Sequence, residues 1–202
     1  MKAGRTLALL AMTFAPCFAE ALTQGERDRA MSELHAARKM FLDSIEGLTQ
    51  AQWNFKPSPD PWSIREIAEH ITVSEDSLFD LLTKKILQLP AQPEKRGQTK
   101  PNDEQIITSA LDRGKKAKAP EFLQPAGRWH DRKSLIEHFK RSRDRNIIYA
   151  RTTQDDLRAH FMARPAGGGD MDGYQFLLLI AAHCERHVAQ INEVKASANY
   201  PK

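Results

Sequence analysis

The sequence FLLLIAAHCERHVAQINEV, residues 176–194 of this 202-residue chain, is its clearest structural signal. Its inward positions recur at steps of three and four residues, the spacing that places side chains along one face of an α-helix. These positions are Phe176, Ile180, His183, His187, Ile191 and Val194. The stretch therefore predicts a long helix, from about Asp172 to Ala198, with two imidazoles on an otherwise apolar buried face.

Three more long helices are predicted upstream of this one. They cover about residues 23–48, 63–87 and 131–153. Thr23 with Glu26, and Ser63 with Glu66, have the spacing of capping boxes at the starts of the first two. No convincing strand is found. Four helices of similar length, each with one apolar stripe, predict an all-α fold, a four-helix bundle.

The connection between the second and third helices is long and irregular. Residues 90–130 hold five prolines, and we expect only one short helix in this range, over residues 102–111. Loops of this length in a compact domain often cover a functional site or are simply mobile.

The N-terminus resembles a signal peptide. Lys2 and Arg5 precede an apolar run of about a dozen residues, shorter than the roughly 20 that a spanning helix needs. We expect cleavage after Ala19, or after Ala21 in a second frame, with a retained anchor as the alternative. The signal peptide is then residues 1–19, the folded domain is residues 22–198, and the protein is periplasmic or secreted, with no stable membrane insertion after cleavage.

Charge and cysteine content restrict the partners. The formal net charge of +4 falls to +2 when Lys2 and Arg5 leave with the signal peptide, which is too near neutral to indicate nucleic-acid binding. Only Cys184 remains after cleavage, so the domain has no internal disulfide and depends on its apolar core.

A third histidine belongs with the two on the last helix. His70 lies between Ile67 and Ile71 on the buried stripe of the second predicted helix. A single histidine on such a face is more often a core residue with a hydrogen-bond partner. Three imidazoles in one interior are costly without partners, and a metal ion satisfies all of them together. We predict that His70, His183 and His187 bind one divalent ion and leave coordination positions open.

Two segments resemble the DinB/YfiT-like four-helix bundles. They are WSIREIAEHI, residues 62–71, and AHCERHVAQI, residues 182–191. The resemblance implies that His70, His183 and His187 bind a divalent ion, often zinc or nickel, with iron or manganese left open. It also suggests a homodimer. The family includes thiol-dependent transferases and isomerases that use cytosolic thiols. Those thiols are not expected outside the membrane, so export leaves the reaction open.

Three functions remain open at this point. The first is a metal-dependent hydrolase or transferase acting on an unknown small molecule, with Glu66, one turn before His70, as a candidate general base; capping of the helix is the competing role of Glu66. The second is a non-catalytic metal-binding or stress-associated module. The third is a helical interaction protein with metal-free histidines.

Overall fold

A computed structural model describes residues 21–202 apart from 59–60, 115–117 and 165–167; the expected signal peptide over residues 1–19 lies outside the described residues. The helices are α1 (Gln24–Ile45), α2 (Gln50–Asn54), α3 (Ile64–Lys84), α4 (Asp103–Leu111), α5 (Arg132–Thr152) and α6 (Gly173–Lys195). Short 3-10 turns are η1 (Ile86–Gln88), η2 (Pro93–Lys95), η3 (Glu121–Leu123) and η4 (Leu157–Ala159), and the strands are β1 (Phe161–Ala163) and β2 (Asp170–Asp172).

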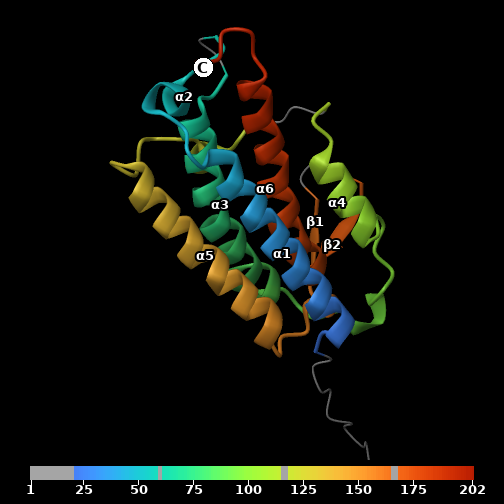
Figure 1. Ribbon diagram of the computed structural model, residues 1–202. Helices are drawn as coiled ribbons and strands as arrows, with labels where there is room; N and C mark the ends of the chain where they lie inside the picture. The colour runs from blue at the N-terminus through green and yellow to red at the C-terminus, as the bar shows by residue number, and fades with distance from the viewer. Residues whose placement is uncertain (1–20, 59–60, 115–117, 165–167) are drawn as a thin grey trace, which may run out of the picture.

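The four long helices form the predicted bundle. Helix α1 packs against α5 and α6, α3 packs against the same two helices, and α4 lies against α6 (Figure 1). Helices α1 and α6 run in one direction, whereas α3 and α5 run in the other (Figure 1). Because α3 and α5 are parallel, the chain must return along the bundle between them. This return accounts for the length of the connection that contains α4.

The core is made by the inward stripes of all four long helices. Phe41 of α1 and Phe139 of α5 meet edge to face, with 4.5 Å between ring centroids. Leu34, Ile71 and Ile180 are fully buried around the same axis. Burial of these side chains, worth about 1.5–3 kcal/mol each relative to exposure, holds the helices in contact.

Capping residues define where the helices begin. The Ser63 hydroxyl accepts a hydrogen bond from the backbone N–H of Glu66, and the Glu66 carboxylate accepts one from the backbone N–H of Ser63. Thr23 and Asp172 form equivalent boxes at α1 and α6. Helix α1 ends at Ile45, earlier than predicted, and Gly47 follows with a φ of 67°. Since glycine adopts this conformation without a steric cost, it turns the chain away from the helix.

The expectation of no strand is wrong. Strands β1 and β2 pair as a short antiparallel hairpin in which Phe161 lies opposite Asp172. Each strand has only three residues, too few to show the alternation of apolar and polar side chains by which strands are recognised. The hairpin leads directly into α6, because Asp172 is both the last residue of β2 and the N-cap of the helix. Helix α2, also unexpected, has five residues and its own capping box.

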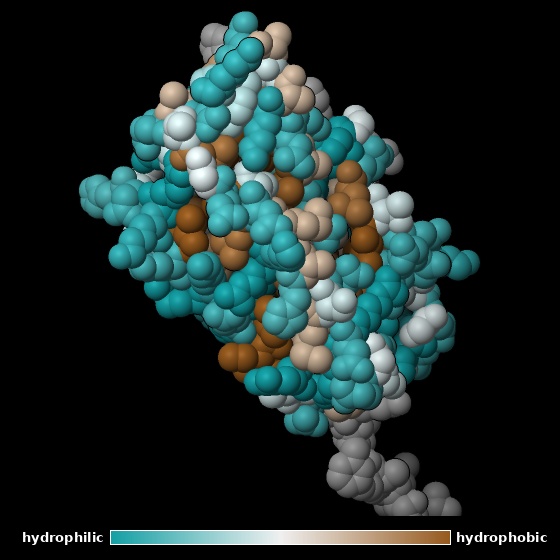
Figure 2. Space-filling model, viewed as in Figure 1, coloured by the Kyte–Doolittle hydropathy of each residue, from teal (hydrophilic) through white to brown (hydrophobic). Residues whose placement is uncertain are grey.

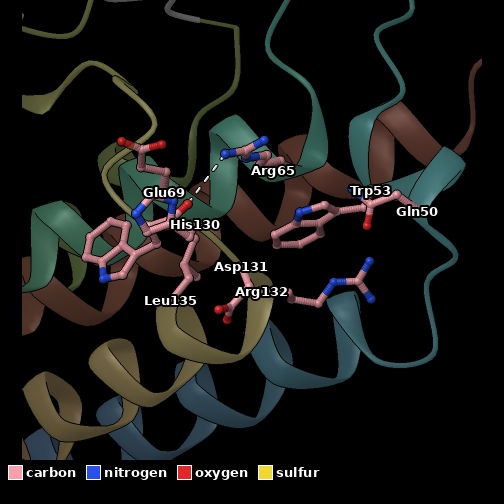
Figure 3. Close-up of a pocket in the computed structure, with 9 residues that line it drawn as sticks. Gln50, Trp53, Arg65, Glu69, His130, Asp131, Arg132 and Leu135 are labelled. Atoms are coloured by element: carbon pink, nitrogen blue, oxygen red, sulfur yellow. Dashed lines mark hydrogen bonds between the residues drawn. The ribbon is translucent and has the colours of Figure 1, made fainter.

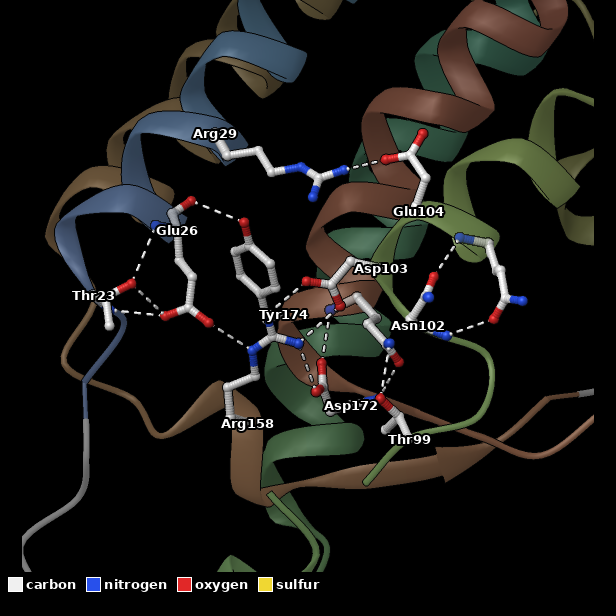
Figure 4. Close-up of polar contacts among 12 residues, drawn as sticks. Thr23, Glu26, Arg29, Thr99, Asn102, Asp103, Glu104, Arg158, Asp172 and Tyr174 are labelled. Carbon is white, nitrogen blue, oxygen red and sulfur yellow. Dashed lines mark hydrogen bonds and ion pairs between the residues drawn. The ribbon is translucent and has the colours of Figure 1, made fainter. Parts of the chain in front are cut away.

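A cluster of ion pairs connects the N-terminal ends of α1, α4 and α6. The Arg158 guanidinium donates to the carboxylates of Glu26 on α1, Asp103 on α4 and Asp172, at 2.8, 2.7 and 2.9 Å (Figure 4). Arg158 also lies over the ring of Tyr174, 4.1 Å from its centroid. One side chain thus fixes α4 and the start of α6 relative to α1.

The surface is mainly polar. Figure 2 shows hydrophilic side chains over most of one face, with hydrophobic ones visible in the furrows between them. Within the described part of the chain, none of the helices combines the length and the apolar character required to cross a membrane.

Candidate metal centre

The three predicted histidines lie together between α3 and α6. His183 and His187 are one turn apart on α6, and His70 faces them from α3, which runs antiparallel to α6 (Figure 1). One ring nitrogen from each lies within 4.8 Å of those of the other two. The ring centroid of His70 is 5.1 Å from that of His183 and 4.4 Å from that of His187. Segments more than 100 residues apart therefore present three nitrogen donors to one point.

Hydrogen bonds fix the orientation of two of these rings. The Nδ1–H of His70 donates to the backbone carbonyl of Leu123 at 2.8 Å, and the Nδ1–H of His187 donates to Oε1 of Gln190 at 2.8 Å. With a proton on each Nδ1, the neutral rings turn bare Nε2 lone pairs toward each other across 3.1 Å. A cation coordinated by both nitrogens would satisfy both lone pairs. The donor set thus fits a divalent ion bound by imidazole nitrogen.

The comparisons with known proteins agree with the fold. A sequence profile of the DinB superfamily matches residues 33–191. The chain belongs to the DinB superfamily. It is 26% identical over 172 residues to the uncharacterized protein YuaE of Bacillus subtilis (strain 168). The aligned region covers 82% of this chain and 96% of YuaE.

Among solved structures, this DinB-superfamily chain is similar to YfiT from Bacillus subtilis, described as a probable metal-dependent hydrolase with an unusual four-helix bundle topology. The TM-score is 0.56 at 14% identity, covering 90% of this chain and 93% of YfiT. At this identity the similarity establishes the shared fold. The predicted relationship to DinB/YfiT-like proteins is confirmed.

The histidines of this DinB-superfamily site are held in their neutral form. Burial lowers the pKa of His70, against the opposing effect of its bond to Leu123. Burial lowers the pKa of His187 to about 3, and burial together with the neighbouring imidazoles of His187 and His70 lowers that of His183 well below its usual value. Because metals bind the neutral ring, these shifts keep all three ligands available at neutral pH.

Glu66 lies at the start of α3 and caps it. Its carboxylate accepts hydrogen bonds from the backbone and hydroxyl of Ser63 and pairs with Lys56 at 2.8 Å. Burial opposes ionisation of Glu66, but the bonds from Lys56 and Ser63 outweigh it and lower the pKa. The carboxylate is therefore ionised and engaged in capping, while its role as a general base stays a prediction.

The residues that surround the histidines were not predicted from the sequence. The ring centroid of Trp62, the residue before the N-cap of α3, lies 5.0 Å from that of His70. Gln190, three residues after His187, was detectable from helical spacing. The Leu123 carbonyl was not, because a backbone group in an irregular segment has no sequence signature.

Three further histidines and Cys184 lie away from this group. Cys184 is fully buried on another face of α6, and its thiol contacts the carbonyl of Ala37. His138 contacts the Asp76 carboxylate through Nε2 at 2.6 Å, and His160 contacts the Leu89 carbonyl. His35 is exposed on α1. None of these side chains belongs to the three-histidine group.

Proposed function

We propose that this protein is a metal-dependent hydrolase in which His70, His183 and His187 hold one divalent ion. The observation that supports this most strongly is the convergence of three ring nitrogens within 4.8 Å, two of them oriented by hydrogen bonds on the opposite side of the ring. Three neutral ligands leave the full charge on the ion and positions open for other molecules. Zinc and nickel both suit imidazole donors, and iron or manganese are further candidates.

A bound ion supplies Lewis acidity, which lowers the pKa of bound water toward about 7 and polarises an electrophile. The protein supplies the geometry. The Leu123 carbonyl and Gln190 hold the rings of His70 and His187 so that Nε2 faces the centre. Ser74, one turn after His70 on the same face of α3, is buried, and its hydroxyl has no hydrogen-bond partner among the described residues. That hydroxyl is available to orient a substrate or a water.

We favour hydrolysis over thiol transfer because of the expected export of the protein. A signal peptide over residues 1–19 takes the folded domain away from the cytosolic thiols that a transferase would use. Water is then the nucleophile that remains available outside the cytosol. The proposal also draws on YfiT, the structural relative that is described as a probable metal-dependent hydrolase.

The test is turnover by the purified protein loaded with zinc, nickel or cobalt. Activated esters, amides and phosphate esters are assayed for the wild type, for His183→Ala and for His35→Ala as the exposed control. We expect hydrolysis of at least one class, lost on chelation and in His183→Ala and kept in His35→Ala. Hydrolysis that survives both chelation and His183→Ala would contradict the proposal.

The position of the site favours one alternative, a structural metal. An ion here joins α3 to α6 and therefore cross-links two helices that are distant in sequence. Melting curves with and without chelator distinguish the two roles. A large loss of stability on chelation, combined with a closed four-ligand shell and no turnover, indicates a structural ion; a modest loss with an open position indicates catalysis.

A further inference from the structure

The carboxylate of Glu69, next to His70 on α3, binds residues 126–128 of one loop. Glu69 is charged although its side chain, on α3, is only 3% exposed. Its Oε1 accepts hydrogen bonds from the backbone N–H groups of Ala126 and Arg128, at 2.8 and 3.1 Å, and its Oε2 accepts one from Gly127 at 3.0 Å. Oε1 also pairs with the Arg128 guanidinium at 3.0 Å. Four donors from one short segment therefore satisfy this buried charge.

The backbone of the loop is shaped to provide these donors. Gly127 has a φ of 72°, a conformation that side chains other than hydrogen rarely allow. Successive N–H groups in such a turn point into a common concavity that binds an anion. In Figure 3, Glu69 projects from α3 toward the segment that continues into His130 and Asp131. The loop thus wraps the carboxylate before α5 begins.

Arg128 connects Glu69 to the backbone around Leu123, the residue that contacts His70. Its guanidinium donates to the backbone carbonyls of Phe122 and Gln124, at 3.2 and 2.8 Å. Leu123 lies between these two residues, and its own carbonyl accepts the Nδ1–H of His70. The contacts therefore form a closed path: α3 holds the loop through Glu69, and the loop holds His70 of α3 through Leu123.

We propose that Glu69 is a positioning residue that, through Arg128 and the loop of residues 122–128, places the Leu123 carbonyl on Nδ1 of His70 and so fixes which nitrogen of His70 faces the metal centre. The effect on metal affinity rests on the proposed function, whereas the effect on the imidazole does not.

Glutamate at position 69 is required by the chemistry of the contact. All four groups around the carboxylate are donors, so both of its oxygens must accept. Glutamine has the same shape but replaces one oxygen with an NH₂ group, which then faces a donor at close range. Glu69→Gln therefore loosens the loop with almost no change in volume. Glu121, exposed in the same segment, provides the matched control, since Glu121→Gln removes the same charge.

The first readout uses the metal-free protein at neutral pH. The ¹⁵N shifts of the His70 ring report which nitrogen carries the proton. We expect a single Nδ1–H form in the wild type and in Glu121→Gln, and a mixture of both tautomers in Glu69→Gln. A single Nδ1–H form in Glu69→Gln, with the fold intact by circular dichroism, overturns the proposal. So does a wild type whose His70 carries its proton on Nε2.

The second readout is zinc affinity measured against a competing chelator. Loss of a group that orients a metal-binding histidine typically weakens binding about 10- to 100-fold, and we expect this for Glu69→Gln and no change for Glu121→Gln. Unchanged zinc affinity in Glu69→Gln overturns the link to the metal centre. If the wild type binds no metal, the proposed function fails, while the tautomer measurement still decides the role of Glu69.

Arg128→Ala provides a second route if Glu69→Gln does not fold. It leaves the three backbone hydrogen bonds to Glu69 in place and removes the bonds to the carbonyls of Phe122 and Gln124. We expect it to shift the His70 tautomers in the same direction. A His70 ring unchanged in a folded Arg128→Ala contradicts the path through Arg128.

Discussion

Replacing Arg143 tests the buried charges that hold α3 to α5. Its guanidinium is fully buried and donates to the Glu75 carboxylate at 2.5 Å. Asn146 donates to the other oxygen of Glu75 at 2.9 Å. Arg143→Met keeps most of the volume but leaves the buried carboxylate with one side-chain donor. Removing one member of a buried pair costs about 3–5 kcal/mol, so we expect a loss of that size in the free energy of unfolding at pH 8.

The loss depends on pH in a defined direction. Burial already raises the pKa of Glu75, against the attraction of Arg143. Without Arg143, the pKa in the folded state rises further above that of the unfolded chain. A carboxyl group of this kind binds its proton more tightly when folded, so stability falls as pH rises through the interval between the two pKa values. The variant should therefore lose less stability at pH 5 than at pH 8.

Urea unfolding followed by circular dichroism measures both effects. A second variant, Glu75→Leu with Arg143→Met, removes both charges and should recover most of the stability, since a buried pair often contributes little net energy. The Nε of Arg143 has no hydrogen-bond partner among the described residues, which adds to the cost of keeping it buried. A loss below about 1 kcal/mol at pH 8, or an equal loss at both pH values, would show that Arg143 does not stabilise the buried charge of Glu75.

Three further predictions concern single residues. Burial raises the pKa of the Cys184 thiol to about 12, so a thiol reagent should label the protein only after urea unfolds it, and rapid labelling of the native protein contradicts the buried position. Ser63→Ala removes the cap of α3 and should lower the free energy of unfolding by about 1 kcal/mol, measured by urea titration; no change would mean that the cap is not formed in solution. Gly169→Ala places a methyl group in steric overlap with the Lys100 carbonyl, whereas Gly97→Ala, also at positive φ, meets nothing within 4 Å. Only Gly169→Ala should therefore lower the free energy of unfolding by more than the roughly 1–2 kcal/mol conformational cost, and equal losses contradict the close approach.

The fold was predictable because its signals are local. Capping residues such as Ser63 and Asp172 mark helix starts, and the apolar stripes repeat over 20 or so residues. The three-residue strands and α2 escaped prediction because short elements carry no readable period. The length of the connection was visible in the sequence. Its cause, the parallel course of α3 and α5, was not.

The histidines were predictable for a similar reason. His183 and His187 occupy positions in an apolar seam where a polar side chain needs a partner. The supporting charges gave no such signal, because a single Glu or Arg in a helix is normally exposed. Glu69, Glu75 and Arg143 are buried only because partners 57 to 109 residues away satisfy them. Partners at such separation become visible only when the chain is folded.

Metal stoichiometry is the decisive test of the three-histidine site. The purified protein is dialysed against zinc, its bound zinc is measured by elemental analysis, and the measurement is repeated for His70→Ala, His183→Ala and His187→Ala, with His35→Ala as the control. We expect one zinc per chain in the wild type and the control, and far less in each of the three variants. Full occupancy in all three variants, or no zinc in the wild type, would contradict a metal centre between α3 and α6.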